Sequence, residues 1–174
     1  MFKLLVIIMF ALSGCTDQGH LALLNSVNQN VYSFQGRIDS ISYQNIINIL
    51  KINADLPVII NANSNGGYID GILDAMDAIH NHGQVTWNVK SYDACVSACA
   101  VLGMSAKNIN GKLNFHSVYT RYDSKSYKLL GNNDEIQTRL IQFGYDTQLV
   151  KQFFKSINIY RSIEFKDGKI IQIN

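Results

Sequence analysis

Residues 56–67 read LPVIINANSNGG, and this stretch decides the fold class. Its first part, Leu56 to Ile60, is a short apolar run behind a proline, which is typical of a buried strand. Its second part carries asparagines and paired glycines, which form turns. The residues that follow predict an amphipathic helix, with apolar side chains at helical spacing and aspartates between them. The apolar set is Ile69, Ile72, Leu73, Met76 and Ile79, and the aspartates are Asp70, Asp74 and Asp77.

The same alternation of short apolar runs and helical stripes continues on both sides of this unit. Strands are predicted at 31–38, 85–89 and 113–115, helices at 42–52 and 94–106, one or two helices broken near Gly144 at 135–154, and a strand-like pattern around the Asp167-Gly168 turn at 162–173. Strands separated by helices predict an α/β domain with a mostly parallel sheet. The chain shows neither an internal repeat nor a domain boundary.

Composition narrows the function classes. The chain has 174 residues with 47% hydrophobic and 16% charged residues, enough for one compact domain with a sizeable core. A net charge of +2 without a run of Lys or Arg gives no electrostatic case for a nucleic-acid partner. The four histidines and three cysteines are not spaced like a zinc site, so no metal or other cofactor is expected.

The first residues have the order of a secretory leader. Met1-Phe2-Lys3 is a short positive start, residues 4–12 are a continuous apolar run, and Leu12-Ser13-Gly14-Cys15 follows. This ending resembles the lipobox of bacterial lipoproteins, in which small residues admit a peptidase and the cysteine thiol accepts a lipid. A plain secretory leader or an N-terminal anchor, with Cys15 incidental, is the alternative. The apolar run is too short to span a bilayer as a mature helix.

Lipidation at Cys15 divides the chain into a signal peptide (1–14), a polar tether (15–30) and a folded domain (31–174). We expect the mature chain to be anchored in the cell envelope, and Thr16 after the cysteine favours the outer membrane, facing the periplasm. In such an oxidising compartment Cys95 and Cys99 could be bridged. Because they are four residues apart, a bridge requires Cys95 to lie just before regular helix; the sequence leaves this open.

Three segments carry the candidate chemistry. Residues 63–67 (NSNGG) join a strand to a helix, and their glycines free the backbone to point amides at a ligand. Residues 95–100 (CVSACA) place Ser97 among small residues at the head of a helix, where its hydroxyl could act as a nucleophile. His116 follows a predicted strand and could serve as a base. Each segment alone is more often structural, but the combination is specific.

The combination of Gly66-Gly67, C-x-S-A-C and Phe115-His116 resembles the Clp-type serine peptidase/crotonase superfamily, and within it the exported Clp-like proteins. The similarity covers about residues 31–160. It implies a fold of repeated strand-strand-helix units and a homo-oligomer. It also implies a peptide or unfolded protein as substrate, with no metal or nucleotide.

The resemblance also implies roles for individual residues. Ser97 is the nucleophile that forms the acyl-enzyme, and His116 removes its proton. The amides of Gly67 and Ala98 hold the oxyanion, while Gly66 shapes the turn. Gly66-Gly67 further resembles the strip that pairs with an extended peptide substrate.

The chain departs from the family pattern at two places. Asn65 replaces a proline that commonly precedes the two glycines. The acid expected downstream of the histidine is missing from residues 155–160, where Asn158 could orient an imidazole instead. Asp146 and Asp167 are the nearest acids, although neither lies at the expected position.

The missing acid leaves other functions open. The same fold could be a binding or structural lipoprotein whose site is inactive. Alternatively, Lys107 or Lys112 could act as the base, as in the Ser–Lys chemistry of signal-peptide-peptidase relatives, and His116 would then be incidental. Acyl-CoA chemistry is least favoured, since coenzyme A is not expected outside the cytoplasm.

Overall fold

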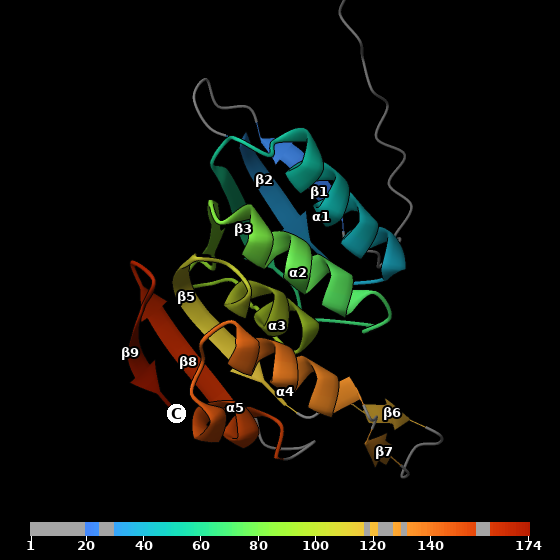
Figure 1. The fold of residues 1–174 in the computed structure, drawn as a ribbon, viewed down its shortest axis with the longest axis vertical. Helices are drawn as coiled ribbons and strands as arrows, with labels where there is room; N and C mark the ends of the chain where they lie inside the picture. Colours follow the sequence, from blue (N-terminus) through green and yellow to red (C-terminus); the bar gives the residue numbers. More distant parts are fainter. Residues whose placement is uncertain (1–19, 25–29, 117–118, 122–126, 130–131, 156–160) are drawn as a thin grey trace, which may run out of the picture.

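The computed structural model describes residues 20–24, 30–116, 119–121, 127–129, 132–155 and 161–174 (Figure 1). A seven-stranded sheet is formed by β1 (His20–Leu24), β2 (Asn30–Gln35), β3 (Val58–Asn63), β4 (Val85–Asn88), β5 (Asn108–Phe115), β8 (Arg161–Lys166) and β9 (Lys169–Ile173). Across its front in Figure 1 lie α1 (Ser40–Ile52), α2 (Ile72–His82), α3 (Ala98–Met104), α4 (Asn132–Gln142) and α5 (Thr147–Phe153). A separate hairpin pairs β6 (Tyr119–Arg121) with β7 (Tyr127–Leu129).

The α/β class predicted from the sequence is confirmed, but the mostly parallel sheet is wrong. The strand order is β1-β2-β3-β4-β5-β8-β9, and only the central strands β2 to β5 pair in parallel. The pairs β1–β2, β5–β8 and β8–β9 are antiparallel, so the sheet is mixed. Strand direction follows from the connections: the tight Asp167-Gly168 turn reverses the chain between β8 and β9, whereas helices connect the parallel strands.

The predicted tether at 15–30 also differs from the structure in part. Residues 20–24 form β1, which pairs in antiparallel register with β2, from His20 opposite Gln35 to Leu24 opposite Val31. The sequence HLALL supplies apolar residues for this edge strand. The ordered sheet therefore begins before residue 31. Residues 1–19, including the predicted leader and Cys15, lie outside the described residues.

One hydrophobic core fills the space between the sheet and the helices. Every second residue of β3, namely Val58, Ile60 and Ala62, is fully buried, which is the period of a strand with one face against helices. Trp87 of β4 is fully buried as well. α1 and α2 bury one stripe each, including Tyr43, Ile46 and Leu50 on α1 and Ile72, Met76 and Ile79 on α2, whereas α3 is buried along its whole length.

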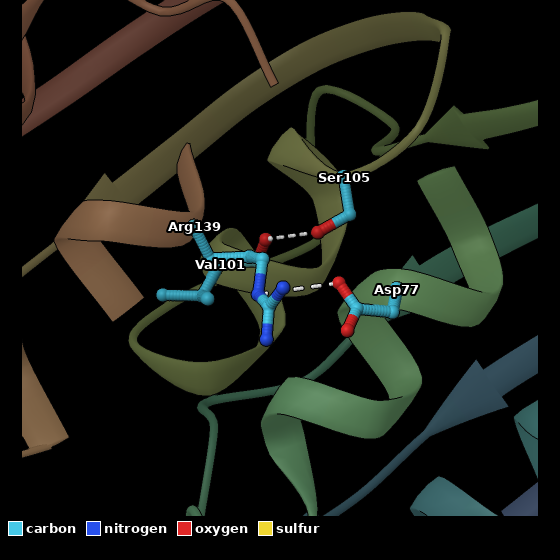
Figure 2. Close-up of polar contacts among 4 residues, drawn as sticks. All are labelled: Asp77, Val101, Ser105 and Arg139. Carbon is cyan, nitrogen blue, oxygen red and sulfur yellow. Dashed lines mark hydrogen bonds and ion pairs between the residues drawn. The ribbon is translucent and has the colours of Figure 1, made fainter. Parts of the chain in front are cut away.

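Local signals set the helix positions. α1 begins after Asp39, whose carboxylate accepts the Ser42 backbone N–H at 2.8 Å in a capping box. An ion pair connects α4 to α2, in which Arg139 Nε lies 3.2 Å from Asp77 Oδ1 (Figure 2). At the end of α3, the Ser105 hydroxyl donates to the Val101 carbonyl at 3.3 Å. None of the helices among the described residues is long and apolar enough to cross a bilayer.

The parallel arrangement of β2 to β5 places the carboxyl ends of these strands at one edge of the sheet. The three segments singled out from the sequence all leave the sheet at this edge. In α/β sheets this is the edge where ligand sites form.

Candidate functional site

A short extended segment before α3 occupies the gap beyond the end of β4. Ser64 and Cys95 form a parallel bridge, and so do Val96 and Asn114. The Val96 amide donates to the Ser64 carbonyl at 3.0 Å, and the Ser97 amide donates to the Asn114 carbonyl at 2.9 Å. Segment 94–97 is therefore held between the chain after β3 and the last residues of β5, and Ser97 lies at the centre of this edge.

Ser97 has a strained backbone. Its φ is 58° and its ψ is −121°, and it stands at the N-cap of α3 without making a side-chain cap bond. The other described non-glycine residue with positive φ is Asp167, which lies in the β8–β9 turn, where aspartate is tolerated. A residue in a sparsely populated conformation costs about 1–3 kcal/mol and is found disproportionately at functional sites. Ser97 is half-buried, so its hydroxyl is not sealed inside the core.

A disulfide closes the serine turn. Cys95 and Cys99 are bonded, with their Cα atoms 5.2 Å apart, and both side chains are fully buried. Cys95 lies before α3 and Cys99 in its first turn, the one arrangement that the spacing allows. The covalent loop contains Ser97 at its middle and therefore limits the conformations of this residue.

Gly66 packs directly against the serine turn. Its φ is 88°, and a Cβ atom built on it would lie 2.7 Å from the Val96 carbonyl oxygen, 2.8 Å from Ser97 Cβ and 3.2 Å from the Ala98 nitrogen. Real Cβ atoms are not found this close to other atoms, so position 66 requires glycine for both its conformation and its neighbours. Gly66 therefore allows the turn at 63–67 to pack closely against Ser97.

The backbone groups of the two glycines are used differently. The Gly66 carbonyl accepts the Ile38 amide at 3.0 Å, and the Gly66 amide donates to Ser64 Oγ at 3.1 Å. Tyr68 donates its amide to the Ile38 carbonyl at 2.9 Å. A Cβ atom built on Gly67 would overlap the backbone of Ile38, so position 67 also requires glycine. Among the described residues the Gly66 backbone is therefore hydrogen-bonded at both its N–H and its C=O, whereas the Gly67 backbone forms no such bond.

Two amides at the site are available to an oxyanion. Within the described part of the chain, neither Gly67 nor Ala98 donates its N–H to a protein acceptor. The Ala98 amide follows Ser97 directly and lies beside Gly66. Amides held next to a nucleophile stabilise the negative charge that develops on the attacked carbonyl oxygen. The oxyanion roles expected for Gly67 and Ala98 stay predictions.

Ser64 and Tyr43 support this edge and were not singled out from the sequence. Ser64 is buried, and its hydroxyl donates to the Gly36 carbonyl at 2.5 Å while accepting the Gly66 amide. The Tyr43 hydroxyl on α1 donates to the Tyr68 carbonyl at 2.5 Å. Burial, with the charges of Asp70 and Asp39, raises the pKa of Tyr43 far above its ordinary value, so it remains a neutral donor. A serine within a polar turn and an aromatic residue on an apolar face have ordinary packing roles, so neither carried a signal.

His116 follows β5 directly and is half-buried. The structure places it at the same sheet edge as Ser97, because Asn114, two residues before it, accepts the Ser97 amide. The predicted alternatives for a third catalytic residue are placed differently. The Asp146 carboxylate caps α5 by accepting the Leu149 amide at 2.8 Å, and Asn158 lies outside the described residues.

The two lysines considered as alternative bases are not at the centre of this edge. Lys107 precedes the first residue of β5 and is therefore at the opposite edge of the sheet from Ser97. Lys112 is exposed on β5, with Glu164 of β8 as its Cα partner. Among the described residues no three His, Cys, Asp or Glu side chains come together in a way that could hold a metal ion.

Comparison with known proteins identifies the fold. No family model and no curated protein matches the chain. The solved structure of a serine-to-alanine variant of the 1510-N membrane-bound stomatin-specific protease is similar, with a TM-score of 0.63 and 15% identity over 81% of this chain and 74% of that chain. A lysine-to-alanine variant of that protease in complex with a substrate peptide has a TM-score of 0.58 and 14% identity, over 79% and 67% of the two chains. The likeness supports the predicted Clp-type peptidase fold.

Proposed function

We propose that this chain is a serine hydrolase of the peptidase type, which cleaves extended peptide or unfolded protein through an acyl-enzyme on Ser97. The observation that carries the proposal is the strained backbone of Ser97, held by the disulfide and packed against Gly66. A packing serine has no need of a positive φ, whereas a nucleophile presented on a sharp turn does. The substrate peptide bound by the structurally similar protease favours a peptide ligand here.

The reaction would proceed in two steps. Ser97 Oγ attacks the scissile carbonyl carbon while His116 accepts the hydroxyl proton, and the amides of Gly67 and Ala98 hold the oxyanion. The C–N bond then breaks as His116 returns the proton to the leaving amine, which gives an ester on Ser97. Water activated by His116 attacks this ester, releases the acid product and restores the serine hydroxyl.

An extended substrate would lie along Gly67. Among the described residues the Gly67 backbone forms no hydrogen bond, so its C=O could pair with an extended peptide while its N–H serves the oxyanion. Main-chain pairing selects extended conformation and is indifferent to most side chains. It therefore suits unfolded protein as a substrate class.

We further propose that the chain is a lipoprotein anchored through Cys15 in the cell envelope, facing the periplasm, and that it assembles as a homo-oligomer. The L-S-G-C sequence and the disulfide beside Ser97, which needs an oxidising compartment, support the export. Radiolabelled palmitate should enter the wild-type chain expressed in a Gram-negative host and should not enter Cys15→Ala. Light scattering of the detergent-extracted chain should give a mass above that of one subunit.

Two other functions are alternatives to a hydrolase with a Ser97–His116 dyad. The lysine-to-alanine variant made in the similar protease favours a Ser–Lys dyad as second choice, with His116 structural. The third reading is a binding protein whose site is inactive.

Hydrolysis of unfolded casein by the full chain distinguishes these readings. We expect cleavage by the wild type and none by Ser97→Ala or His116→Ala. Cleavage retained by His116→Ala and lost in Lys112→Ala would support the lysine alternative. Equal behaviour of the wild type and Ser97→Ala would contradict the hydrolase proposal.

A further inference from the structure

A cavity of about 360 Å³ opens beside Gly67, between the chain that leaves β2 and the chain that leaves β3. Residues 36–37 line one side and residues 63–67 the other. The two glycines of the catalytic turn thus form part of its wall. Of the residues that line it, Arg37 is the one with a charge, and none carries a carboxylate.

Arg37 is held in place without being neutralised. Its guanidinium carbon lies 4.6 Å from the centroid of the Tyr68 ring, which is a cation–π contact. The backbone of Tyr68 is held by the Ile38 carbonyl and the Tyr43 hydroxyl, and its ring is exposed. Among the described residues no carboxylate forms an ion pair with Arg37. The side chain is exposed, so its charge is available to a ligand.

The acid closest to Arg37 in sequence, Asp39, is bonded at the start of α1. The Asp39 carboxylate accepts the backbone and side-chain hydrogen bonds of Ser42 at the start of α1. Asp70 and Asp39 both act on the buried hydroxyl of Tyr43. Neither acid lines the cavity, so Arg37 is the charged residue among those that line it.

The opposite wall adds neutral donors. Asn63 Oδ1 accepts the Ala94 backbone amide at 3.1 Å, which leaves the side-chain nitrogen of Asn63 as a donor. The side chain of Asn65 is bonded to no described residue, and both asparagines are exposed. An arginine and two asparagines that line one cavity, with no acid in its lining, match the chemistry of a carboxylate ligand.

We propose that this cavity binds a carboxylate of the peptide substrate and that Arg37 is a specificity-determining residue. The carboxylate comes from an acidic side chain or from the free C-terminus of the peptide. The inference deepens the proposed function and rests on it for the identity of the ligand as a peptide. Since Gly66 separates the cavity from Ser97, the carboxylate would lie within about two residues of the scissile carbonyl, at about 3.3 Å per residue of extended chain.

The test measures binding without turnover. Full-length Ser97→Ala is titrated into fluorescein-labelled decapeptides of alanine and serine, and fluorescence anisotropy is followed. One set has an amidated C-terminus and a single Glu moved along the peptide, a second set has Gln in its place, and a third has Gln with a free C-terminal carboxylate. We expect one carboxylate-bearing set to bind about tenfold more tightly than the amidated Gln set, as for a charged hydrogen bond. The peptide set that binds more tightly identifies the source of the carboxylate.

The tighter binding of the carboxylate-bearing peptides must depend on Arg37. It should disappear when Arg37→Gln is added to Ser97→Ala, and Arg37→Lys should restore part of it. Lys90→Gln is the matched control, because Lys90 is also an exposed cation over an exposed tyrosine, 5.8 Å from the Tyr92 ring centroid, but does not line the cavity. Equal binding of all sets, no binding by any set, or a preference that survives Arg37→Gln would overturn the proposal.

The carboxylate site and the proposed hydrolase function can be overturned independently of each other. Casein cleavage by the wild type without any Arg37-dependent preference would overturn the carboxylate site and leave the hydrolase intact. Arg37-dependent binding by a chain whose wild type cleaves nothing would support the site and remove the hydrolase.

Discussion

Gly66 lies so close to Ser97 that a Cβ atom at position 66 would be 2.8 Å from the serine Cβ. The two residues are 31 positions apart and belong to different turns, yet each has a positive φ, 88° at Gly66 and 58° at Ser97. The glycine turn and the serine turn are therefore one packed unit. A substitution in either turn should therefore change the position of the Ser97 hydroxyl.

Replacing Gly66 by alanine tests this unit. Gly66→Ala should destabilise the chain by the cost of an alanine at positive φ, about 1–2 kcal/mol, and by about 1–3 kcal/mol more for the clash with Val96 and Ser97. Gly144→Ala is the matched control, since Gly144 has φ 99° and nothing within 4 Å of an added Cβ. Urea denaturation should show a larger loss for Gly66→Ala. Equal losses would show that the contact with Ser97 is not tight.

The Ser64 hydroxyl should contribute more to the free energy of unfolding than its small size suggests. Ser64→Ala leaves the Gly66 amide and the Gly36 carbonyl without their buried partner, at a cost of about 1–3 kcal/mol. Ser105→Ala also removes a buried hydroxyl but only a 3.3 Å bond to the helical Val101 carbonyl, so about 1 kcal/mol or less is expected (Figure 2). The free energy of unfolding gives this comparison, and the reverse order would contradict the role given to Ser64.

The disulfide should stabilise the serine turn. Cys95→Ala/Cys99→Ala should lower the free energy of unfolding by about 2 kcal/mol, the value expected for a very short loop. The chain should also react more slowly at Ser97, because the turn gains conformations. Dithiothreitol should lower the stability of the wild type and leave the double variant unchanged. A wild type whose thermal midpoint does not respond to reduction under denaturing conditions would exclude this contribution.

The cap of α1 predicts a pH dependence. Hydrogen bonds from the Ser42 amide and hydroxyl lower the pKa of Asp39 in the folded chain. The stabilisation is therefore complete above the unfolded pKa of about 3.9 and is lost as the pH falls through the lower folded pKa. Asp39→Asn keeps a good capping residue but does not titrate. Between about pH 5 and pH 2 the wild type should lose more stability than Asp39→Asn; parallel curves would contradict the assignment.

Local patterns in the sequence identified the central units well. The apolar run before Gly66 is β3, and the stripe from Ile72 to Ile79 is α2, since burial of one face leaves a period that can be counted. Strand direction leaves no such trace. The pairing of β5 with β8 joins residues about 50 positions apart, and a mostly parallel sheet was predicted because helices separate most of the strands.

The candidate site was likewise predictable only in part from the sequence. Residue types and spacing drew attention to Ser97, His116 and the paired glycines. The positive φ of Ser97 and the bonds of Ser64 depend on contacts between turns that are distant in sequence. Arg37 carried no signal at all, because an isolated arginine after a strand is an ordinary surface residue until the fold brings it beside Gly67.

Labelling of Ser97 by a fluorophosphonate tests the central claim most directly. The full chain is incubated with the probe, and the modified residue is located by peptide mass spectrometry. We predict one adduct on Ser97 in the wild type, and none in Ser97→Ala or in His116→Ala. A folded wild-type chain that gains no adduct at any pH between about 6 and 9 would contradict the proposal that Ser97 is an activated nucleophile.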